Sequence, residues 1–210
     1  MTNLSIIGCG NMGRGIATRA LAGRNPVQLL DRDPGRASAL ASELTGEVTS
    51  GEVGDPLSGD VVVLAVPYEA AIPLVTDYGD ALNGKVVIDI TNPVDFASFD
   101  RLVTPPETSA AEEIAAAAPR GARVVKAFNT TFAGTLVTGQ VAGQPLDVLL
   151  AGDDDDAKAT VASVVEAGGL RAIDAGPLRR ARQLEHTGFL HMALQQPLGT
   201  EFGSALRFLS

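Results

Sequence analysis

Hydrophobic residues along this chain fall into short continuous runs that alternate with longer stretches of helical periodicity. The runs are rich in Val, Ile and Leu and are bounded by Gly, Asp or Pro. This pattern is typical of strands that are buried on both faces and are therefore parallel. Such strands are predicted at 4–8, 27–31, 60–66, 85–90, 123–128 and 147–152, with one more short strand at 171–176.

Helices are predicted between these runs, at about 11–23, 34–44, 107–118, 154–167 and 178–196. Ser109 and Glu112 have the spacing of a capping box at the start of the third helix. The four aspartates at 153–156 resemble a metal cluster. We interpret them as caps of the following helix, because carboxylates oppose the positive end of its dipole, and we expect no metal site.

The alternation of strands and helices predicts an α/β fold, namely a Rossmann-type doubly wound parallel sheet with helices on both sides. After about residue 130 the pattern changes to two short strands and a long helical stretch. We therefore expect a dinucleotide-binding Rossmann domain at 1–130 and a small C-terminal α/β lobe at 131–210 that closes the cleft.

A glycine-rich turn follows the first predicted strand. Gly8, Gly10 and Gly13 form the pattern G-x-G-x-x-G between a strand and a helix, which is the context of a dinucleotide-binding turn. The N-terminus of that helix offers free N–H groups to phosphates. Together with Asn11 and Met12, the turn is predicted to hold a pyrophosphate. A tight turn without a ligand is the alternative.

The second predicted strand ends at Asp31, near the spacing expected for the acidic residue that binds the adenosine ribose. Its carboxylate would accept hydrogen bonds from the 2′-hydroxyl of NAD and repel the 2′-phosphate of NADP. Arg32 and Arg36 favour the opposite choice, because a guanidinium pairs well with a phosphate. Both NAD(H) and NADP(H) are therefore kept as candidate cofactors.

Polar and turn-forming residues follow the remaining strands, at the edge where doubly wound sheets bind ligands. Their amides, hydroxyls and carbonyls suit a nicotinamide carboxamide and a second planar ring, although ordinary turns have a similar composition. The predicted cofactor contacts here are Val66, Pro67 and Tyr68 after the strand at 60–66, Asn92 and Pro93 after the strand at 85–90, and Asn129 after the strand at 123–128.

Composition and charge restrict the partners. The 210 residues carry a net charge of −9 and only 4% aromatic residues, so we expect neither nucleic acid nor membrane partners. Cys9 is the only cysteine, which excludes an internal disulfide. The sequence shows neither a signal-peptide pattern nor an apolar run long enough to span a membrane, so a cytoplasmic protein is expected.

The sequence shows none of the common nucleophile, metal or P-loop motifs, so no catalytic residue is assigned. His186 and His191 are five residues apart on a predicted helix and would not face one metal. Hydride transfer between two redox rings needs alignment more than a protein acid, whereas ketone or imine reduction needs a proton donor. Two alternatives stay open: a small imine or carbonyl reductase that uses Lys126 or Tyr68 as the donor, and a non-catalytic NAD(P)-sensing module. Lys126 also fits a strand lysine anchored to carbonyls or a carboxylate.

Seven segments together carry a family resemblance over nearly the whole chain. They are IIGCGNMGRGIA (6–17), VVLAVPYEAA (62–71), VVIDITNP (86–93), SAAEEIAAAAP (109–119), RVVKAFNTTFAG (123–134), VLLAGDDDDAK (148–158) and AIDAGPLRRARQLE (172–185). With these segments the chain resembles the NADPH-dependent oxidoreductases of the deazaflavin coenzyme F420, and also the oxidoreductase domain of the STEAP metalloreductases.

The resemblance implies hydride transfer between a nicotinamide and a deazaflavin (coenzyme F420) or flavin-like ring in the cleft. It also implies a Rossmann domain with a small C-terminal lobe, often in a homodimer. Members that use NADP usually carry a small residue followed by Arg after the second strand, whereas this chain has Asp31 followed by Arg32.

Overall fold

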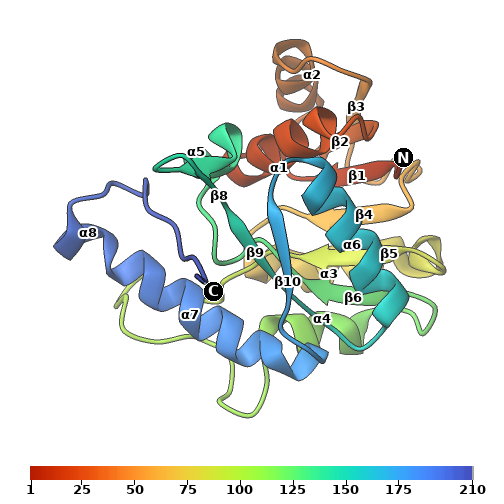
Figure 1. The fold of residues 1–210 in the computed structure, drawn as a ribbon. Coiled ribbons are helices and arrows are strands. Elements are labelled where there is room, and N and C mark those ends of the chain that lie inside the picture. The colour runs from red at the N-terminus through yellow and green to blue at the C-terminus, as the bar shows by residue number, and fades with distance from the viewer. Residues whose placement is uncertain (210) are drawn as a thin grey trace.

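The computed structural model describes residues 1–209, and its main sheet has the strand order β10-β9-β6-β5-β4-β1-β2-β3 (Figure 1). The strands of this sheet are β1 (Leu4–Ile7), β2 (Val27–Asp31), β3 (Val48–Glu52), β4 (Val61–Leu64), β5 (Val86–Asp89), β6 (Arg123–Lys126), β9 (Asp147–Gly152) and β10 (Arg171–Asp174). A separate hairpin consists of β7 (Gln140–Val141) and β8 (Gln144–Pro145).

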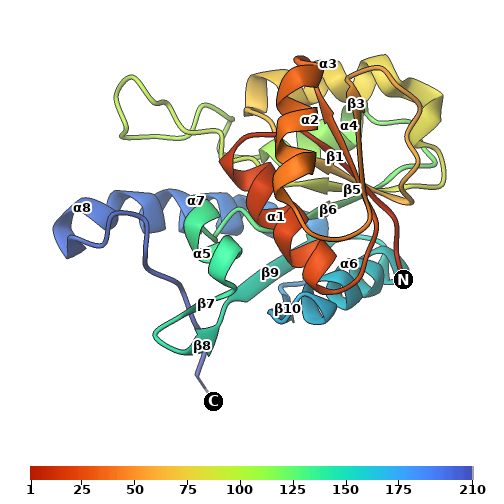
Figure 2. The ribbon, with the colours of Figure 1, turned by 90° about the horizontal axis from the view of Figure 1, so that it is seen from above.

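Helices cover both faces of the sheet. They are α1 (Asn11–Ala22), α2 (Pro34–Glu43), α3 (Tyr68–Tyr78), α4 (Ala110–Ala117), α5 (Ala133–Thr138), α6 (Asp155–Ala167), α7 (Ala181–Ala193) and α8 (Gln195–Leu198), with short 3₁₀ helices at Gly79–Leu82 and Leu178–Arg180. One apolar core lies under α1, α2 and α6, and a second lies under α3, α4 and the start of α7 (Figure 2).

The strands from β1 to β6 pair in parallel, and every residue of β1, β4 and β5 is buried. The predicted α/β fold of the Rossmann type is therefore confirmed. The prediction that 147–152 is also a parallel strand is wrong at its pairing with β6, since β9 runs antiparallel to that strand. All six residues of β9 are buried, and a fully buried strand has the same composition in either direction.

Several elements were not predicted from the hydrophobic pattern, among them β3, α3 and α5. Strand β3 is an edge strand with mostly exposed residues, so it has no apolar run. Helix α3 contains Pro73, a residue that normally ends a helix, and it begins directly after Pro67. Helix α5 has only six residues, too few to show a helical period.

The predicted helix starts are confirmed at two positions. Ser109 is the N-cap of α4 and accepts a hydrogen bond from the backbone N–H of Glu112 at 3.2 Å. Asp154 is the N-cap of α6 and accepts one from the N–H of Ala157 at 2.7 Å. The aspartates at 153–156 thus include the predicted cap.

The residues after 130 extend the same sheet, because β9 pairs with β6 and β10 pairs with β9. The predicted boundary at 130/131 falls between β6 and α5, where the pairing changes from parallel to antiparallel. The division into a Rossmann domain at 1–130 and a small C-terminal lobe at 131–210 that closes the cleft stays a prediction. Among residues 1–209, no helix has both the length and the apolar character that crossing a membrane would require.

Candidate functional site

The glycine turn joins β1 to α1 at the carboxyl edge of the sheet. Gly8 has a φ of +105°, and a Cβ atom on it would lie 2.2 Å from the backbone oxygen of Ala65. A Cβ atom on Gly13 would lie 2.0 Å from the backbone oxygen of Gly8. A Cβ atom on Gly10 would meet no atom of the described residues within 4 Å. Packing therefore requires Gly8 and Gly13, whereas Gly10 leaves space for a ligand.

The first turn of α1 offers unpaired backbone donors. Gly10 is the N-cap and contributes no side-chain acceptor, and the first turn carries no acidic residue. Asn11 is exposed, and Met12 packs partly buried against the core. The N–H groups at this end are free to bind an anion, as the predicted pyrophosphate site requires.

A cavity of about 680 Å³ opens beside this turn, a volume suited to a small-molecule ligand. The lining residues come from the ends of β1, β2 and β4 and the segments that follow them, from the segment after β3, and from α2 and α3. They are Ile7, Gly8, Cys9, Gly10, Asp31, Arg32, Arg36, Val53, Ala65, Val66, Pro67, Glu69, Ala70, Pro73, Leu74 and Asp77. The cavity brings together seven predicted site residues: Gly8, Gly10, Asp31, Arg32, Arg36, Val66 and Pro67.

Asp31 ends β2 and is 9% exposed. Its Oδ2 accepts a hydrogen bond from the backbone N–H of Cys9 at 2.8 Å, and its Oδ1 accepts one from the N–H of Asp33 at 3.1 Å. Burial opposes ionisation, but these two donors, with Arg36 and Arg32 nearby, lower the pKa of Asp31 below its usual value. Burial, with a smaller effect of Asp31, raises the pKa of the Cys9 thiol to about 11. The ionised carboxylate therefore stabilises the glycine turn through its hydrogen bond from the N–H of Cys9.

Arg32 and Arg36 are exposed residues that line the cavity. Within residues 1–209, neither guanidinium makes a hydrogen bond or an ion pair of the kind that Arg14 makes with Glu43 at 2.6 Å. Two positive groups thus stand at the cavity edge next to Asp31, whose oxygens already have backbone donors. This arrangement is suited to an anionic group on a ligand.

Asn92 and Asn129, both predicted as cofactor contacts, lie against each other beyond β5 and β6. Asn92 Nδ2 donates to the backbone oxygen of Asn129 at 2.8 Å, and Asn129 Nδ2 donates to Asn92 Oδ1 at 2.9 Å and to the backbone oxygen of Leu184 at 2.8 Å. Asn129 Oδ1 is buried without a partner among the described residues. Neither side chain lines the 680 Å³ cavity.

The backbone around this amide pair is tightly constrained. Phe128, which precedes Asn129, has a φ of +61°, an uncommon conformation for a bulky residue. A Cβ atom on Gly188 of α7 would lie 2.7 Å from Asn92 Oδ1 and 2.8 Å from the backbone oxygen of Asn129. Helix α7 therefore packs closely against the amide pair. Pro93, which follows Asn92, is buried.

Tyr68, another predicted cofactor contact, lies at the start of α3 and outside the lining of the cavity. Its hydroxyl donates a hydrogen bond to the Glu113 carboxylate. Burial, with the negative charge of Glu113, raises the pKa of Tyr68 well above its usual value. The phenol is therefore committed to a partner inside the protein.

Lys126 is fully buried, at 0% exposed, and lies at the end of β6. Its Nζ donates to Asp89 Oδ2 at 2.7 Å, to the backbone oxygen of Thr91 at 2.5 Å and to Glu185 Oε1 at 2.8 Å. The interpretation as an anchored strand lysine is confirmed. No ligand reaches this amine without a rearrangement of the core.

Glu185 of α7 was not predicted from the sequence, because a single glutamate in a helical stretch shows no sign of burial. It accepts hydrogen bonds from the N–H groups of Ala110 and Ala111 at 3.1 Å and 3.3 Å, so it caps α4 from another helix. Burial, only partly offset by Lys126, raises the pKa of Glu185. This carboxylate fixes α7 over the ends of β5 and β6.

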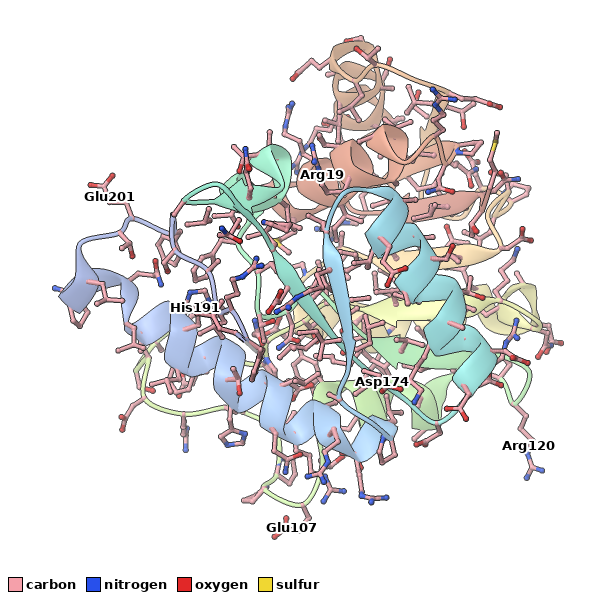
Figure 3. All side chains as sticks on the ribbon, in the orientation of Figure 1. Arg19, Glu107, Arg120, Asp174, His191 and Glu201 are labelled. Atoms are coloured by element: carbon pink, nitrogen blue, oxygen red, sulfur yellow. The ribbon has the colours of Figure 1, made fainter. Side chains whose placement is uncertain are left out.

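The two histidines have separate surroundings. His191 is buried on α7 beside the C-terminal tail (Figure 3), with Nδ1 3.1 Å from the backbone oxygen of Thr130 and Nε2 2.9 Å from Ser204 Oγ. His186 is exposed, with Nδ1 2.8 Å from the backbone oxygen of Arg182. The described part of the chain contains no group of three or more His, Cys, Asp or Glu side chains placed to hold a metal.

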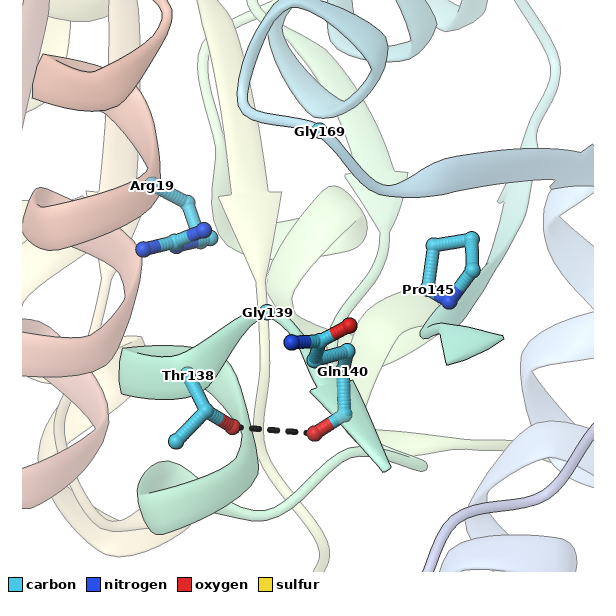
Figure 4. Close-up of a pocket in the computed structure, with 6 residues that line it drawn as sticks. All are labelled: Arg19, Thr138, Gly139, Gln140, Pro145 and Gly169. Carbon is cyan, nitrogen blue, oxygen red and sulfur yellow. Dashed lines mark hydrogen bonds between the residues drawn. The ribbon is translucent and has the colours of Figure 1, made fainter. Parts of the chain in front are cut away.

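A smaller cavity of about 200 Å³ lies between α1, the β7–β8 hairpin and the end of α6 (Figure 4). Arg19 lines it and donates to the backbone oxygens of Val137 at 2.9 Å and Gly168 at 3.4 Å. The ends of α5 and α6 thus direct carbonyls at this guanidinium, which balances their negative dipole ends. Arg19 has a structural role here, without a further feature that points to a ligand.

The glycine turn gives a direct test of ligand space against packing. We expect Gly10→Ala to keep the stability of the protein and to weaken dinucleotide binding at least tenfold, because its Cβ projects into empty space. Gly13→Ala is the matched control and should lose stability, because its Cβ would overlap the Gly8 carbonyl. Thermal unfolding and fluorescence titration with NADPH measure the two effects. Unchanged affinity in folded Gly10→Ala would contradict the assignment.

The profile of the family described as "NADP oxidoreductase coenzyme F420-dependent" matches residues 3–93. The F420-dependent NADP reductase of Methanothermobacter thermautotrophicus is 35% identical over 193 residues, which are 85% of this chain and 82% of that protein. Metalloreductase STEAP3 of Rattus norvegicus is 31% identical over 182 residues, which are 87% of this chain. This chain spans only 35% of the length of STEAP3.

Among solved structures, a putative F420-dependent NADP reductase from Arthrobacter sp. FB24 superposes with a TM-score of 0.88 at 28% identity, with both chains covered in full. The fold and the glycine turn thus define an NAD(P)-dependent oxidoreductase. The sequence similarity over most of the chain identifies a narrower group within this class. The chain belongs to the family of F420-dependent NADP oxidoreductases.

Proposed function

We propose that this protein transfers a hydride between NADP(H) and the deazaflavin ring of coenzyme F420. The observation that carries the proposal is the 680 Å³ cavity, where a glycine turn with open N–H donors lies next to two unpaired guanidinium groups. The F420-dependent NADP reductases that this chain resembles support the same reaction.

NADP(H) is favoured over NAD(H) by the surroundings of Asp31. Both of its oxygens accept backbone hydrogen bonds, so the carboxylate is held against the turn rather than extended toward a ribose. Arg32 and Arg36 lie beside it with free donors and suit a 2′-phosphate. The pyrophosphate is proposed to lie on Gly8–Gly13, at the N-terminus of α1.

The nicotinamide is proposed to lie past Val66 and Pro67, toward Asn92 and Asn129. Val66 and Pro67 line the cavity at the end of β4, the strand next to β1 and β5. The amide pair follows β5 and β6 along the same carboxyl edge, and the unpartnered Asn129 Oδ1 is the acceptor that we propose for the nicotinamide carboxamide. Tyr68 and Pro93 are proposed to support this wall from behind.

A hydride moves with its electron pair from C4 of NADPH to the deazaflavin ring, and a proton from water completes the reduced ring. The protein is required to align two flat rings and to exclude water, and no side chain has to donate the proton. Neither candidate donor is available for this step: Lys126 is fully buried, and the Tyr68 hydroxyl is bound to Glu113 outside the cavity lining.

The test is an absorbance assay that separates this function from the two alternatives. Purified protein with NADPH should reduce oxidised coenzyme F420 without added metal, and Tyr68→Phe should keep most of that rate. An imine or carbonyl reductase would leave F420 unreduced and would lose roughly 10²-fold in rate without its proton donor. A sensing module would bind NADPH and turn over nothing. Tight NADPH binding without F420 or flavin reduction would contradict the proposal.

The protein is further proposed to be a homodimer. Leu190, Leu194 and Leu198 are spaced by four residues along α7 and α8 and are 59%, 38% and 59% exposed. Residues 187–200 contain no Asp, Glu, Lys or Arg, although 20% of the chain is charged. An uncharged apolar helix face of this kind is suited to a second copy. Light scattering should give twice the mass of the chain in solution, and a value equal to one chain would contradict it.

A further inference from the structure

Asp89, Lys126 and Glu185 form a buried charge cluster that the proposed hydride transfer does not use. The Lys126 amine lies 2.7 Å from Asp89 Oδ2 and 2.8 Å from Glu185 Oε1. The exposed fractions of the Lys126, Asp89 and Glu185 side chains are 0%, 0% and 1%. One ammonium group between two carboxylates leaves one negative charge without a balancing cation in the cluster.

The neighbours of both carboxylates are hydrogen-bond donors, which favour the ionised form. Besides the bond from Lys126, Glu185 accepts from two backbone N–H groups at the start of α4, at 3.1 Å and 3.3 Å. Asp89 Oδ1 accepts from the N–H of Thr91 at 2.8 Å. These donors act against burial, which raises the pKa of Glu185. A protonated carboxyl group would instead need an acceptor for its hydrogen.

The buried charge cluster adjoins the amide pair of Asn92 and Asn129. The residue before Asn92 accepts a hydrogen bond from Lys126 on its backbone oxygen, at 2.5 Å. The residue before Glu185 accepts one from Asn129 Nδ2 on its backbone oxygen, at 2.8 Å. Asn129 also follows Lys126 by three positions at the end of β6. Any group that binds at the amide pair therefore lies close to the charge of the cluster.

We propose that Asp89 and Glu185 make the site prefer oxidised over reduced nicotinamide, by holding a net negative charge next to the ring. This inference rests on the proposed position of the nicotinamide at the amide pair. NADP⁺ carries a positive charge on this ring that NADPH lacks, and the phosphates of the two molecules are the same. A buried charge is weakly screened and stabilises the oxidised ring. The same charge favours departure of the hydride from NADPH, because the ring gains its positive charge in that step.

The experiment measures the affinities of NADP⁺ and NADPH by isothermal titration calorimetry and compares their ratio between variants. Glu185→Gln removes one negative charge and keeps the length of the side chain. We expect the preference for NADP⁺ to fall about tenfold, the order that Coulomb's law gives for nearby unit charges inside a protein. Asp89→Asn removes the charge of the other carboxylate and should move the ratio in the same direction by a similar factor.

The ratio separates an electrostatic effect from a structural one, because a distorted site would weaken both nucleotides alike. Glu166→Gln is the matched control, the same substitution at an exposed position of α6. A Cβ atom on Gly23 would lie 2.8 Å from the backbone of Ala167, which places this end of α6 beside the end of α1 away from the glycine turn. This control should leave the ratio unchanged, and circular dichroism should show that each variant is folded.

The native protein gives a result that needs no substitution, since it should bind NADP⁺ more tightly than NADPH. Tighter binding of NADPH by the native protein, or a ratio that folded Glu185→Gln and Asp89→Asn leave unchanged, would overturn this inference while the proposed function stands. A ratio that Glu166→Gln changes equally would also overturn it. Failure of both nucleotides to bind would overturn the inference together with the proposed function.

Discussion

Replacing Lys126 by methionine should lower the free energy of unfolding by about 3–5 kcal/mol, the usual cost of leaving buried charges without their partner. Lys126 is 0% exposed, as is Asp89, with which it pairs at 2.7 Å. The exposed fraction of the Glu185 side chain, its second partner at 2.8 Å, is 1%. Two buried carboxylates would then face each other across a methionine.

Urea unfolding followed by circular dichroism measures this loss, and Arg14→Met is the matched control. Arg14 also pairs with a carboxylate, at 2.6 Å from Glu43, but the side chains are 40% and 53% exposed. Removing this exposed, solvent-screened pair should cost far less than removing Lys126. If Lys126→Met costs no more than Arg14→Met, the buried cluster does not hold α7 in place as we describe.

The combined substitution Arg32→Ala and Arg36→Ala should weaken NADPH binding roughly 10²-fold and leave NADH binding nearly unchanged. Each charge-assisted hydrogen bond to a phosphate contributes about 1.5–3 kcal/mol, and solvent screens this exposed pair toward the low end. NADH lacks the 2′-phosphate, so removing the two arginines removes no contact with it. Fluorescence titrations with both nucleotides at fixed ionic strength measure the two affinities.

Arg24→Ala controls for the loss of positive charge alone. Arg24 is exposed but follows the C-terminal end of α1, away from the glycine turn, so its removal should leave both affinities unchanged. A double variant that loses NADPH and NADH affinity equally would mean that the two arginines do not bind a 2′-phosphate. NADH preference in the native protein would contradict the assignment of Asp31.

The sequence was sufficient to predict the central sheet and the glycine turn, because both depend on local patterns. Parallel strands such as β4 and β5 are buried on both faces and read as continuous apolar runs. Gly8 and Gly13 are required by contacts within a few residues or with the adjacent strand. Strand β3 is mostly exposed, so its composition does not show that it pairs with the sheet. Strand β9 runs antiparallel to β6, and composition does not show the direction of a buried strand.

The walls of the site were harder to predict, because they depend on contacts between distant segments. The part of the cavity lining that α3 contributes was not predicted, because Pro73 lies inside this helix and proline normally ends a helix. Once the helix is assumed, residues 70, 73, 74 and 77 are expected to share one face. Glu185 meets Lys126 across 59 positions of sequence, and only the fold brings them together. The backbone donors that occupy Asp31 are likewise visible only in three dimensions.

Isotope labelling distinguishes direct hydride transfer between the two rings from transfer that passes through solvent. NADPH that carries deuterium at both positions of nicotinamide C4 is incubated with the protein and oxidised coenzyme F420, and the reduced deazaflavin is examined by mass spectrometry. We expect one carbon-bound deuterium in each reduced deazaflavin, because the hydride passes between two aligned rings without exchange with water. Reduced deazaflavin without deuterium, or no reduction at all, would contradict it.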